Sequence, residues 1–96
     1  MIIEVEHEPL KLFLLFGEHA RELISPETGL LFLETYCSSN EAYVQKMRSK
    51  YTIQMILNAN PISRKEVEKG DYCKRMNPNG VDLNRNWDSH WQRVLD

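Results

Sequence analysis

The chain has 96 residues, a formal net charge of −2 and 42% hydrophobic residues. This length suits one small domain and is short for an enzyme with a deep cleft. The near-balanced charge excludes the basic stripe that nucleic-acid binding needs, and no apolar run approaches the roughly 20 residues of a membrane span. We therefore expect a globular domain that binds no nucleic acid and has no membrane span.

The first predicted element is a strand at residues 10–16, where a near-continuous apolar run stops at Gly17. Its length and its glycine stop indicate a strand that is covered on both faces. A helix is predicted next, with Ser25 as its N-cap and Pro26 in its first turn. Apolar residues at helical spacing continue until a polar cluster ends the helix near Ser38.

A second, more exposed helix is predicted over residues 41–50. Residues 51–57 are rich in β-branched and aromatic side chains and predict a second buried strand. Strand, helix, strand is a crossover unit, so we expect the two strands to pair in parallel. After Pro61 periodicity is lost until Trp91, and we interpret this irregular stretch, with a turn at residues 77–80, as functional. No internal domain boundary is visible.

The chain has two cysteines, Cys37 and Cys73. They are too few for a disulfide framework, and they are too far apart in sequence to suggest a zinc site. We interpret each as a buried free thiol.

A first group of polar residues follows directly after the first predicted strand and contains His19 and Glu22. A histidine and a glutamate three residues apart can direct a ring nitrogen and a carboxylate oxygen at one ion, and both are good zinc ligands. Ligands of open α/β sheets bind beyond the carboxyl ends of the strands, which is where this pair lies. Alone, the motif is a weak signal, because any surface loop can contain it by chance.

A second group is the run Gly-Val-Asp-Leu-Asn-Arg-Asn-Trp at residues 80–87. Such a dense polar run is costly to bury unless each group has a partner. The alternative is a solvated turn with an exposed arginine. Against that alternative, Val81, Leu83 and Trp87 are expected to pin the run to the core.

Together the two groups resemble the zinc carboxypeptidase family, and the match extends over nearly the whole chain. In that family a His-x-x-Glu motif follows a central strand, and a helix follows the motif. A strand ending in Asn-x-Asn-Pro, a loop with a substrate-binding arginine and a Gly-Val-Asp-x-Asn-Arg-Asn segment come next. Here the elements appear in that order, at His19 and Glu22, Pro26 onward, residues 58–61, residues 73–75 and residues 80–87.

The resemblance implies an α/β fold, the N-terminal part of a mixed, mostly parallel sheet with flanking helices. Residues 1–96 would form a partial zinc-carboxypeptidase catalytic domain, with the sheet incomplete. The implied activity is zinc-dependent hydrolysis of the C-terminal peptide bond of peptides or proteins, with Zn²⁺ as cofactor.

The resemblance also implies roles for single residues. His19 and Glu22 would be the first two zinc ligands. Arg75 would polarise the scissile carbonyl and stabilise the oxyanion. Asn84 and Arg85 would hold the C-terminal carboxylate of the substrate, because a guanidinium matches a carboxylate with two parallel hydrogen bonds.

Two further roles are implied. Asp82 would accept a hydrogen bond from His19 and fix its tautomer. Arg21 would line the substrate groove, or alternatively form a surface ion pair with Glu18. Several residues compete with these assignments: Lys74, Arg64 and Arg93 with Arg75, and His7 and His90 as extra ligands, a role we expect neither histidine to have.

The family takes its third zinc ligand, a capping tyrosine and the general-base glutamate from segments beyond this chain. Since a catalytic zinc needs about three protein ligands and water, we expect the 96-residue chain to be inactive alone and to need the remainder of the catalytic domain. One alternative is a related zinc amidohydrolase, an acyl-amino-acid deacylase. Another is a non-catalytic remnant that binds peptide C-termini or a partner chain.

Overall fold

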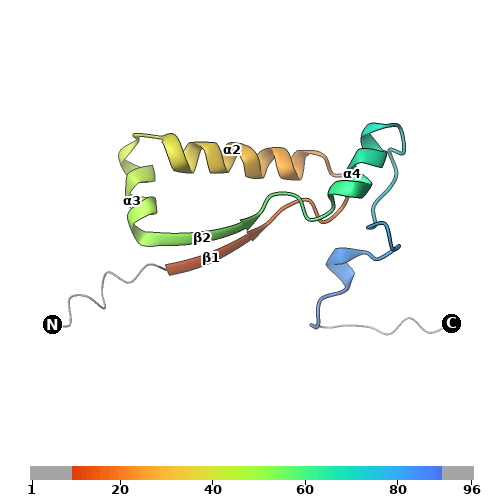
Figure 1. Ribbon diagram of the computed structural model, residues 1–96. Helices are drawn as coiled ribbons and strands as arrows, with labels where there is room; N and C mark the ends of the chain where they lie inside the picture. Colours follow the sequence, from red (N-terminus) through yellow and green to blue (C-terminus); the bar gives the residue numbers. More distant parts are fainter. Residues whose placement is uncertain (1–9, 90–96) are drawn as a thin grey trace.

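The computed structural model of the chain describes residues 10–89. Its elements are β1 (Leu10–Leu15), α2 (Ile24–Ser38), α3 (Ala42–Lys50), β2 (Tyr51–Ile56), α4 (Pro61–Glu68) and the short 3₁₀ helix η1 (Leu83–Arg85). Helix α2 lies along one face of the two strands, while α4 and η1 lie beyond the strands' carboxyl ends (Figure 1). None of the described helices is long and apolar enough to cross a membrane.

The two strands form a parallel sheet, and this confirms the pairing predicted from the crossover pattern. The register runs from Leu10 opposite Tyr51 to Leu15 opposite Ile56. Helices α2 and α3 make the connection between the strands. The predicted α/β class is confirmed, and an open parallel sheet with helices is consistent with part of a larger α/β domain.

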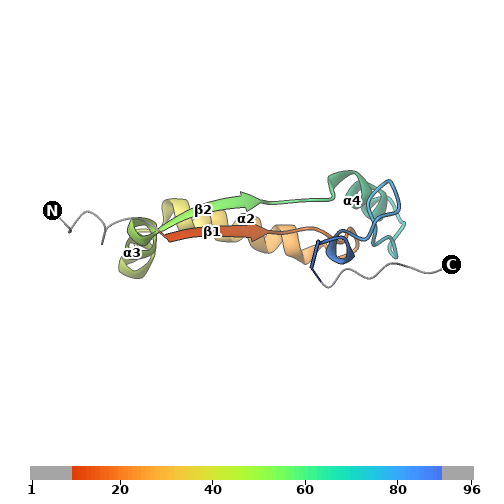
Figure 2. The ribbon, with the colours of Figure 1, turned by 90° about the horizontal axis from the view of Figure 1, so that it is seen from below.

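The strands are not covered on both faces, so that prediction is wrong for the described part of the chain. Phe13 is 56% exposed and Ile56 is 42% exposed. Paired positions share a face, so these two residues lie on the face opposite the half-buried Ile53 and Met55. Figure 2 looks at the sheet from the side away from α2, and no described element lies in front of the strands there. One helical layer therefore covers one face, and Phe13 and Ile56 on the other remain exposed.

Helix α2 confirms Pro26 in the first turn and an end at Ser38, but Ser25 is not its N-cap. The N-cap position is Leu23, and no side chain caps the helix there. Ser25 lies inside the first turn, where its Oγ accepts a hydrogen bond from the Gly17 backbone N–H at 3.0 Å. The hydroxyl therefore holds the end of β1 to the start of α2, and this contact with the preceding loop takes the place of a helix cap.

Both cysteines are free and exposed, so the prediction of buried thiols is wrong. Cys37 lies in the last turn of α2, and Cys73 lies in the irregular segment after α4. A small apolar residue is buried only where a second layer packs over it, and neither thiol is covered by such a layer in the described part of the chain.

Helix α4 forms within the stretch that the sequence analysis interpreted as irregular. Pro61 occupies its first turn, where proline suits a helix start. Its buried side chains are Ser63, which is 0% exposed, and Val67, which is 2% exposed. One of the two buried positions holds a polar residue, so the helical hydrophobic period was not visible in the sequence.

The predicted turn at residues 77–80 is confirmed. The Gly80 N–H donates to the Asn77 carbonyl at 3.0 Å, and Gly80 has a positive φ of 75°. The Asn77 side-chain oxygen also accepts from the backbone N–H of Val81 at 2.9 Å. Asparagine and glycine therefore supply the local hydrogen bonds and the left-handed conformation that the turn needs.

Candidate metal and substrate site

The site begins with a sharp turn at the end of β1. Gly17 has a φ of +78°, and a Cβ placed there would lie 2.8 Å from the Oδ1 of Asn58 and 3.0 Å from the Cγ of Pro26. Both the backbone conformation and the lack of space require glycine. The parallel pairing continues past the strands, because Ala59 N–H donates to the Phe16 carbonyl at 3.0 Å. The loops that follow β1 and β2 therefore start side by side.

His19 and Glu22 lie together on the first of these loops. The Nδ1 of His19 is 2.6 Å from the Oε2 of Glu22, and the imidazole side chain is only 10% exposed. A backbone turn holds the pair, because the Glu22 N–H donates to the His19 carbonyl at 3.2 Å. The structure thus brings both residues of the His-x-x-Glu motif to the carboxyl end of the sheet.

Asp82 contacts the other side of the imidazole ring. The Oδ1 of Asp82 lies 2.9 Å from the Nε2 of His19. The same oxygen accepts a hydrogen bond from the Asn84 backbone N–H at 3.1 Å. The Oδ2 of Asp82 accepts from the Nε of Arg75 at 2.7 Å. One carboxylate therefore holds both the histidine and the arginine of the candidate site.

The charges around Asp82 keep it ionised. The hydrogen bond from Arg75, together with a smaller contribution from the contact with His19, outweighs the opposing effect of desolvation and lowers the pKa of Asp82 to about 2. An ionised carboxylate only accepts hydrogen bonds, so the Nε2 of His19 is the donor in that contact. A neutral imidazole has one N–H, which leaves the Nδ1 with a lone pair.

That lone pair faces the Glu22 carboxylate at 2.6 Å. Two acceptors at this distance repel each other unless a cation, either a proton or a metal ion, lies between them. A ring nitrogen and a carboxylate oxygen are donors that Zn²⁺ accepts in proteins. The donor set of His19 and Glu22 therefore fits zinc, although no group of three or more His, Cys, Asp and Glu side chains within residues 10–89 is arranged to hold a metal ion.

A small polar cavity of about 130 Å³ adjoins the pair. His19, Glu22 and Asn84 are among the residues that line it. The cavity is smaller than the roughly 300–1,000 Å³ of typical organic-ligand pockets. It has room for an ion and a few water molecules.

Arg75 reaches the same place from the loop after α4. Besides its bond to Asp82, its Nη1 lies 3.8 Å from the Oε2 of Glu22. Of its sequence competitors, Arg64 is held elsewhere by ion pairs with Glu27 and Glu68. Arg93, like His7 and His90, lies outside the described residues. Among the described arginines, Arg75 alone pairs with Glu22 and Asp82.

The other predicted substrate-binding residues lie further out. Arg85 is exposed, and its Nη1 donates to the Asn84 carbonyl at 2.9 Å. Arg21 is also exposed, and its Nη1 is 3.4 Å from the Cys73 carbonyl. The alternative ion pair between Arg21 and Glu18 is not formed in the structure of residues 10–89; Glu18 instead accepts from the Trp87 indole at 3.3 Å.

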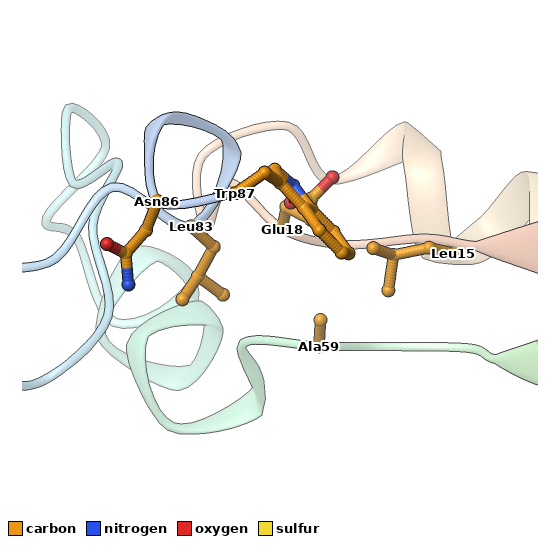
Figure 3. A pocket seen from close by; sticks show the side chains of 6 residues that line it. All are labelled: Leu15, Glu18, Ala59, Leu83, Asn86 and Trp87. Carbon is orange, nitrogen blue, oxygen red and sulfur yellow. The ribbon is translucent and has the colours of Figure 1, made fainter. Parts of the chain in front are cut away.

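A second cavity of about 240 Å³ lies beside the first and shares Leu15 and Glu18 with it. Figure 3 shows the Trp87 side chain beside Glu18 and reaching toward Leu15, with Ala59 across the cavity. Of the three residues expected to pin the run to the core, Val81 and Leu83 are half-buried, but Trp87 is 52% exposed. Its ring lines one side of the cavity.

Sequence analysis did not single out Asn60 as a site residue. Its side chain connects the two loops of the site, the loop of His19 after β1 and the loop of Arg75 after α4. Its Nδ2 donates to the carbonyls of Glu18 and Met76, next to His19 and Arg75 respectively. The signals available were its position before Pro61, which predicts a helix cap, and its place in the Asn-x-Asn-Pro run at residues 58–61 that contributes to the family resemblance. Neither predicts hydrogen bonds to the carbonyls of Glu18 and Met76.

Comparison with known proteins places this chain in a family. The zinc carboxypeptidase family model matches residues 6–95. The chain is 36% identical over 91 residues to zinc carboxypeptidase A 1 of Anopheles gambiae, a match that covers 82% of this chain. It is 29% identical over 89 residues to zinc carboxypeptidase A 1 of Drosophila melanogaster, covering 86% of this chain.

The aligned part is 20% of the Anopheles protein and 21% of the Drosophila protein. The chain therefore spans about a fifth of the length of these curated relatives. No solved structure matches the chain significantly.

Proposed function

The chain belongs to the zinc carboxypeptidase family, and on that premise we propose that the native polypeptide carrying this sequence is a zinc-dependent metallocarboxypeptidase. Its reaction is hydrolysis of the C-terminal peptide bond of peptides or proteins. Residues 1–96 form the first part of the catalytic domain and contribute part of its active site.

The contact that carries this proposal is the one between His19, Glu22 and Asp82. An ionised Asp82 accepts from the Nε2 of His19, and the Nδ1 then faces the Glu22 carboxylate at 2.6 Å. Such a carboxylate behind a histidine orients the ring and raises its basicity as a ligand. A surface loop with a chance His-x-x-Glu spacing has no reason to place an aspartate from a distant segment behind its histidine.

In this proposal His19 and Glu22 hold the zinc ion. Bound there, zinc supplies Lewis-acid activation of water and of the scissile carbonyl. Two protein ligands are fewer than the three that a catalytic zinc usually has. We therefore place the remaining ligand and the general base outside the described residues, and we expect the 96-residue chain by itself to be catalytically inactive.

Arg75 supplies a fixed positive charge beside His19 and Glu22, the two proposed zinc ligands. Its hydrogen bond to Asp82 sets the direction of the guanidinium, and its Nη1 lies toward Glu22. A charge oriented before the reaction needs no reorganisation when negative charge develops on the substrate oxygen. Arg75 therefore suits the stabilisation of the oxyanion.

Asn84, Arg85 and Arg21 bind the substrate in this proposal. Asn84 lines the polar cavity next to His19, and Arg85 follows it directly. The exposed guanidinium of Arg85 is accessible to a carboxylate and can bind it through two parallel hydrogen bonds. Recognition of a free chain end at this position would restrict hydrolysis to the last peptide bond.

The test compares three substrates with the native polypeptide: a long peptide with a free C-terminus, the same peptide amidated, and an N-acyl amino acid. We expect release of the C-terminal residue from the free peptide, no release from the amidated one, loss of activity with a chelator and recovery with zinc. Hydrolysis of the N-acyl amino acid alone would identify a deacylase instead. Peptide binding without any hydrolysis would identify a non-catalytic remnant.

One variant and its control test whether Arg85 binds the C-terminal carboxylate of the substrate. Arg85→Lys keeps the charge and removes the planar fork, so we expect KM for the free peptide to rise about tenfold. Lys46→Ala, on the exposed surface of α3, is the matched control and leaves KM unchanged. An unchanged KM in Arg85→Lys would remove Arg85 from the proposed substrate site.

A further inference from the structure

Asn60 has a helix-cap position but does not cap the helix. It is the N-cap residue of α4, and its side chain makes no capping hydrogen bond. An asparagine at this position ordinarily accepts a hydrogen bond from the first helical N–H groups. The side chain is instead directed into the protein and is 2% exposed.

The amide of Asn60 joins the two loops of the site. Its Nδ2 donates to the Glu18 carbonyl at 3.2 Å and to the Met76 carbonyl at 3.1 Å. Both partners are acceptors, so the amide nitrogen and not the oxygen must face them. Both N–H groups of one nitrogen are therefore used, one for each loop.

The two partners flank the residues that carry the proposed chemistry. Glu18 directly precedes His19, and Met76 directly follows Arg75. The same loops meet once more where the Ala20 N–H donates to the Arg75 carbonyl at 3.1 Å. Asn60 is itself anchored to the end of β2, because its own N–H donates to the Oδ1 of Asn58 at 3.1 Å.

The distance between these loops decides whether Asp82 can serve both partners. Its Oδ1 contacts His19 at 2.9 Å and its Oδ2 accepts from Arg75 at 2.7 Å. If the loops separated, one carboxylate could not make both contacts. The buried amide of Asn60 bonds to the backbone of both loops and so keeps them at the spacing that Asp82 needs.

We infer that Asn60 is a positioning residue of the proposed zinc site, which sets the spacing between the loop of His19 and the loop of Arg75. This inference rests on the proposed function, because it concerns how the same site is held together. No other common side chain of this size offers two N–H donors from one atom: aspartate has none when ionised, and serine has one.

The test uses Asn60→Asp, which keeps the shape and removes both donors, and Asn60→Ser, which keeps one donor in a smaller side chain. The matched control is Asn40→Asp, the same chemical change on the exposed connection between α2 and α3. The first readout is amide hydrogen exchange of the native polypeptide. We expect exchange at Ala20 to accelerate at least about tenfold in Asn60→Asp, while amides of α2 stay unchanged.

The second readout is the absorption spectrum of the Co²⁺-substituted polypeptide, together with kcat and KM. We expect Asn60→Asp to alter the Co²⁺ spectrum and to lower kcat about 10–100-fold with little change in KM. Asn60→Ser should lie between Asn60→Asp and the wild type, and it also serves if Asn60→Asp does not fold. A merely structural role would lower stability and leave the Co²⁺ spectrum and the kcat of the folded fraction unchanged.

The outcomes separate this inference from the proposed function. Unchanged exchange at Ala20 in a folded Asn60 variant overturns the inference even if the wild type is an active zinc enzyme. If exchange at Ala20 is faster but the wild-type protein binds neither Zn²⁺ nor Co²⁺, the proposed function is wrong. Asn60 then sets the loop spacing but positions no zinc site. Faster exchange with an altered spectrum supports both.

Discussion

The strand–helix unit of β1, α2, α3 and β2 and the site region of residues 17–23 and 58–89 show opposite relations between polarity and burial. The unit is rich in apolar side chains, yet Phe13 and Leu31 are more than half exposed. The site region is dominated by polar residues. The buried non-glycine residues of the described part are Ala20, Val44, Asn60, Ser63 and Val67, and all except Val44 lie in the site region.

The difference shows that burial here follows the number of packed layers rather than hydrophobicity. The unit has one helical layer over one face of a two-stranded sheet. In the site region two loops and α4 pack together, and hydrogen bonds to carbonyls and carboxylates hold the loops, although the buried Oδ1 of Asn60 and Oγ of Ser63 have no hydrogen-bond partner among the described residues. The following variants test this contrast, beginning with the largest expected effect.

Removing a ligand from the site region should abolish its chemistry. We expect His19→Ala in the native polypeptide to weaken zinc binding more than about 100-fold. Loss of a residue that only hydrogen-bonds to a metal ligand already costs about 10–100-fold in affinity, and loss of the ligand itself should cost more. Hydrolysis should fall in parallel. Zinc titration and peptide assays measure both, and His7→Ala is the control for a histidine not expected to be a ligand. Equal zinc affinity in His19→Ala and wild type would exclude the proposed ligand.

Gly17 joins the two regions, and we expect Gly17→Ala to destabilise the 96-residue chain by about 3 kcal/mol. The φ of +78° accounts for about 1–2 kcal/mol of this, and the contact of the new Cβ with the Oδ1 of Asn58 accounts for the rest. Gly80→Ala is the matched control, because its φ is +75° and nothing lies within 4 Å of the added Cβ. If urea unfolding shows that Gly17→Ala and Gly80→Ala lose the same free energy of unfolding, the contact between the new Cβ and Asn58 contributes nothing.

Val67 tests the packing of the site region. We expect Val67→Ala to lower the free energy of unfolding by about 2 kcal/mol, since two buried methyl groups are lost and a cavity remains. Ile62→Ala in the same helix should cost less than about 0.5 kcal/mol, because Ile62 is 63% exposed. Chemical denaturation gives both values, and a larger loss for Ile62→Ala would mean that a surface covers it in solution.

Substitutions on the face of the sheet that α2 does not cover should change the free energy of unfolding least. We expect Phe13→Ala to cost the 96-residue chain less than about 1 kcal/mol, because the ring is 56% exposed, whereas a buried phenylalanine costs about 3–5 kcal/mol. The same substitution in the native polypeptide sharpens the comparison. A cost of about 3 kcal/mol or more there would show that further segments cover this face.

Much of the strand–helix unit could be predicted from the sequence. The apolar run before Gly17, the helical spacing after Pro26 and the β-branched run at residues 51–57 each predict one element, and the crossover predicts parallel pairing. The burial of these strands was predicted wrongly, because an apolar run shows that a strand suits a covered position but not that another layer is there to cover it.

The site could be predicted in part as well. The spacing of His19 and Glu22 and the run at residues 80–87 marked the residues that the structure brings together at the carboxyl ends of the strands. Helix α4 and Asn60 were missed, because a buried serine and a long-range amide bond have no periodic signature in the sequence.

The sequence by itself thus determined the two strands, the helices between them and the parallel pairing, because these depend on local spacing and residue chemistry, whereas the candidate ligands were implied by the resemblance to the zinc carboxypeptidase family. The contact of Asp82 with His19, 63 residues away in sequence, was implied by the family resemblance, but only the tertiary structure decided that the same carboxylate also accepts from Arg75. It also decided that Ser25 and Asn60 bond to distant backbone instead of capping their own helices. The reason is that a polar side chain makes the hydrogen bonds that the packed chain presents to it, and residues far away in sequence supply these partners.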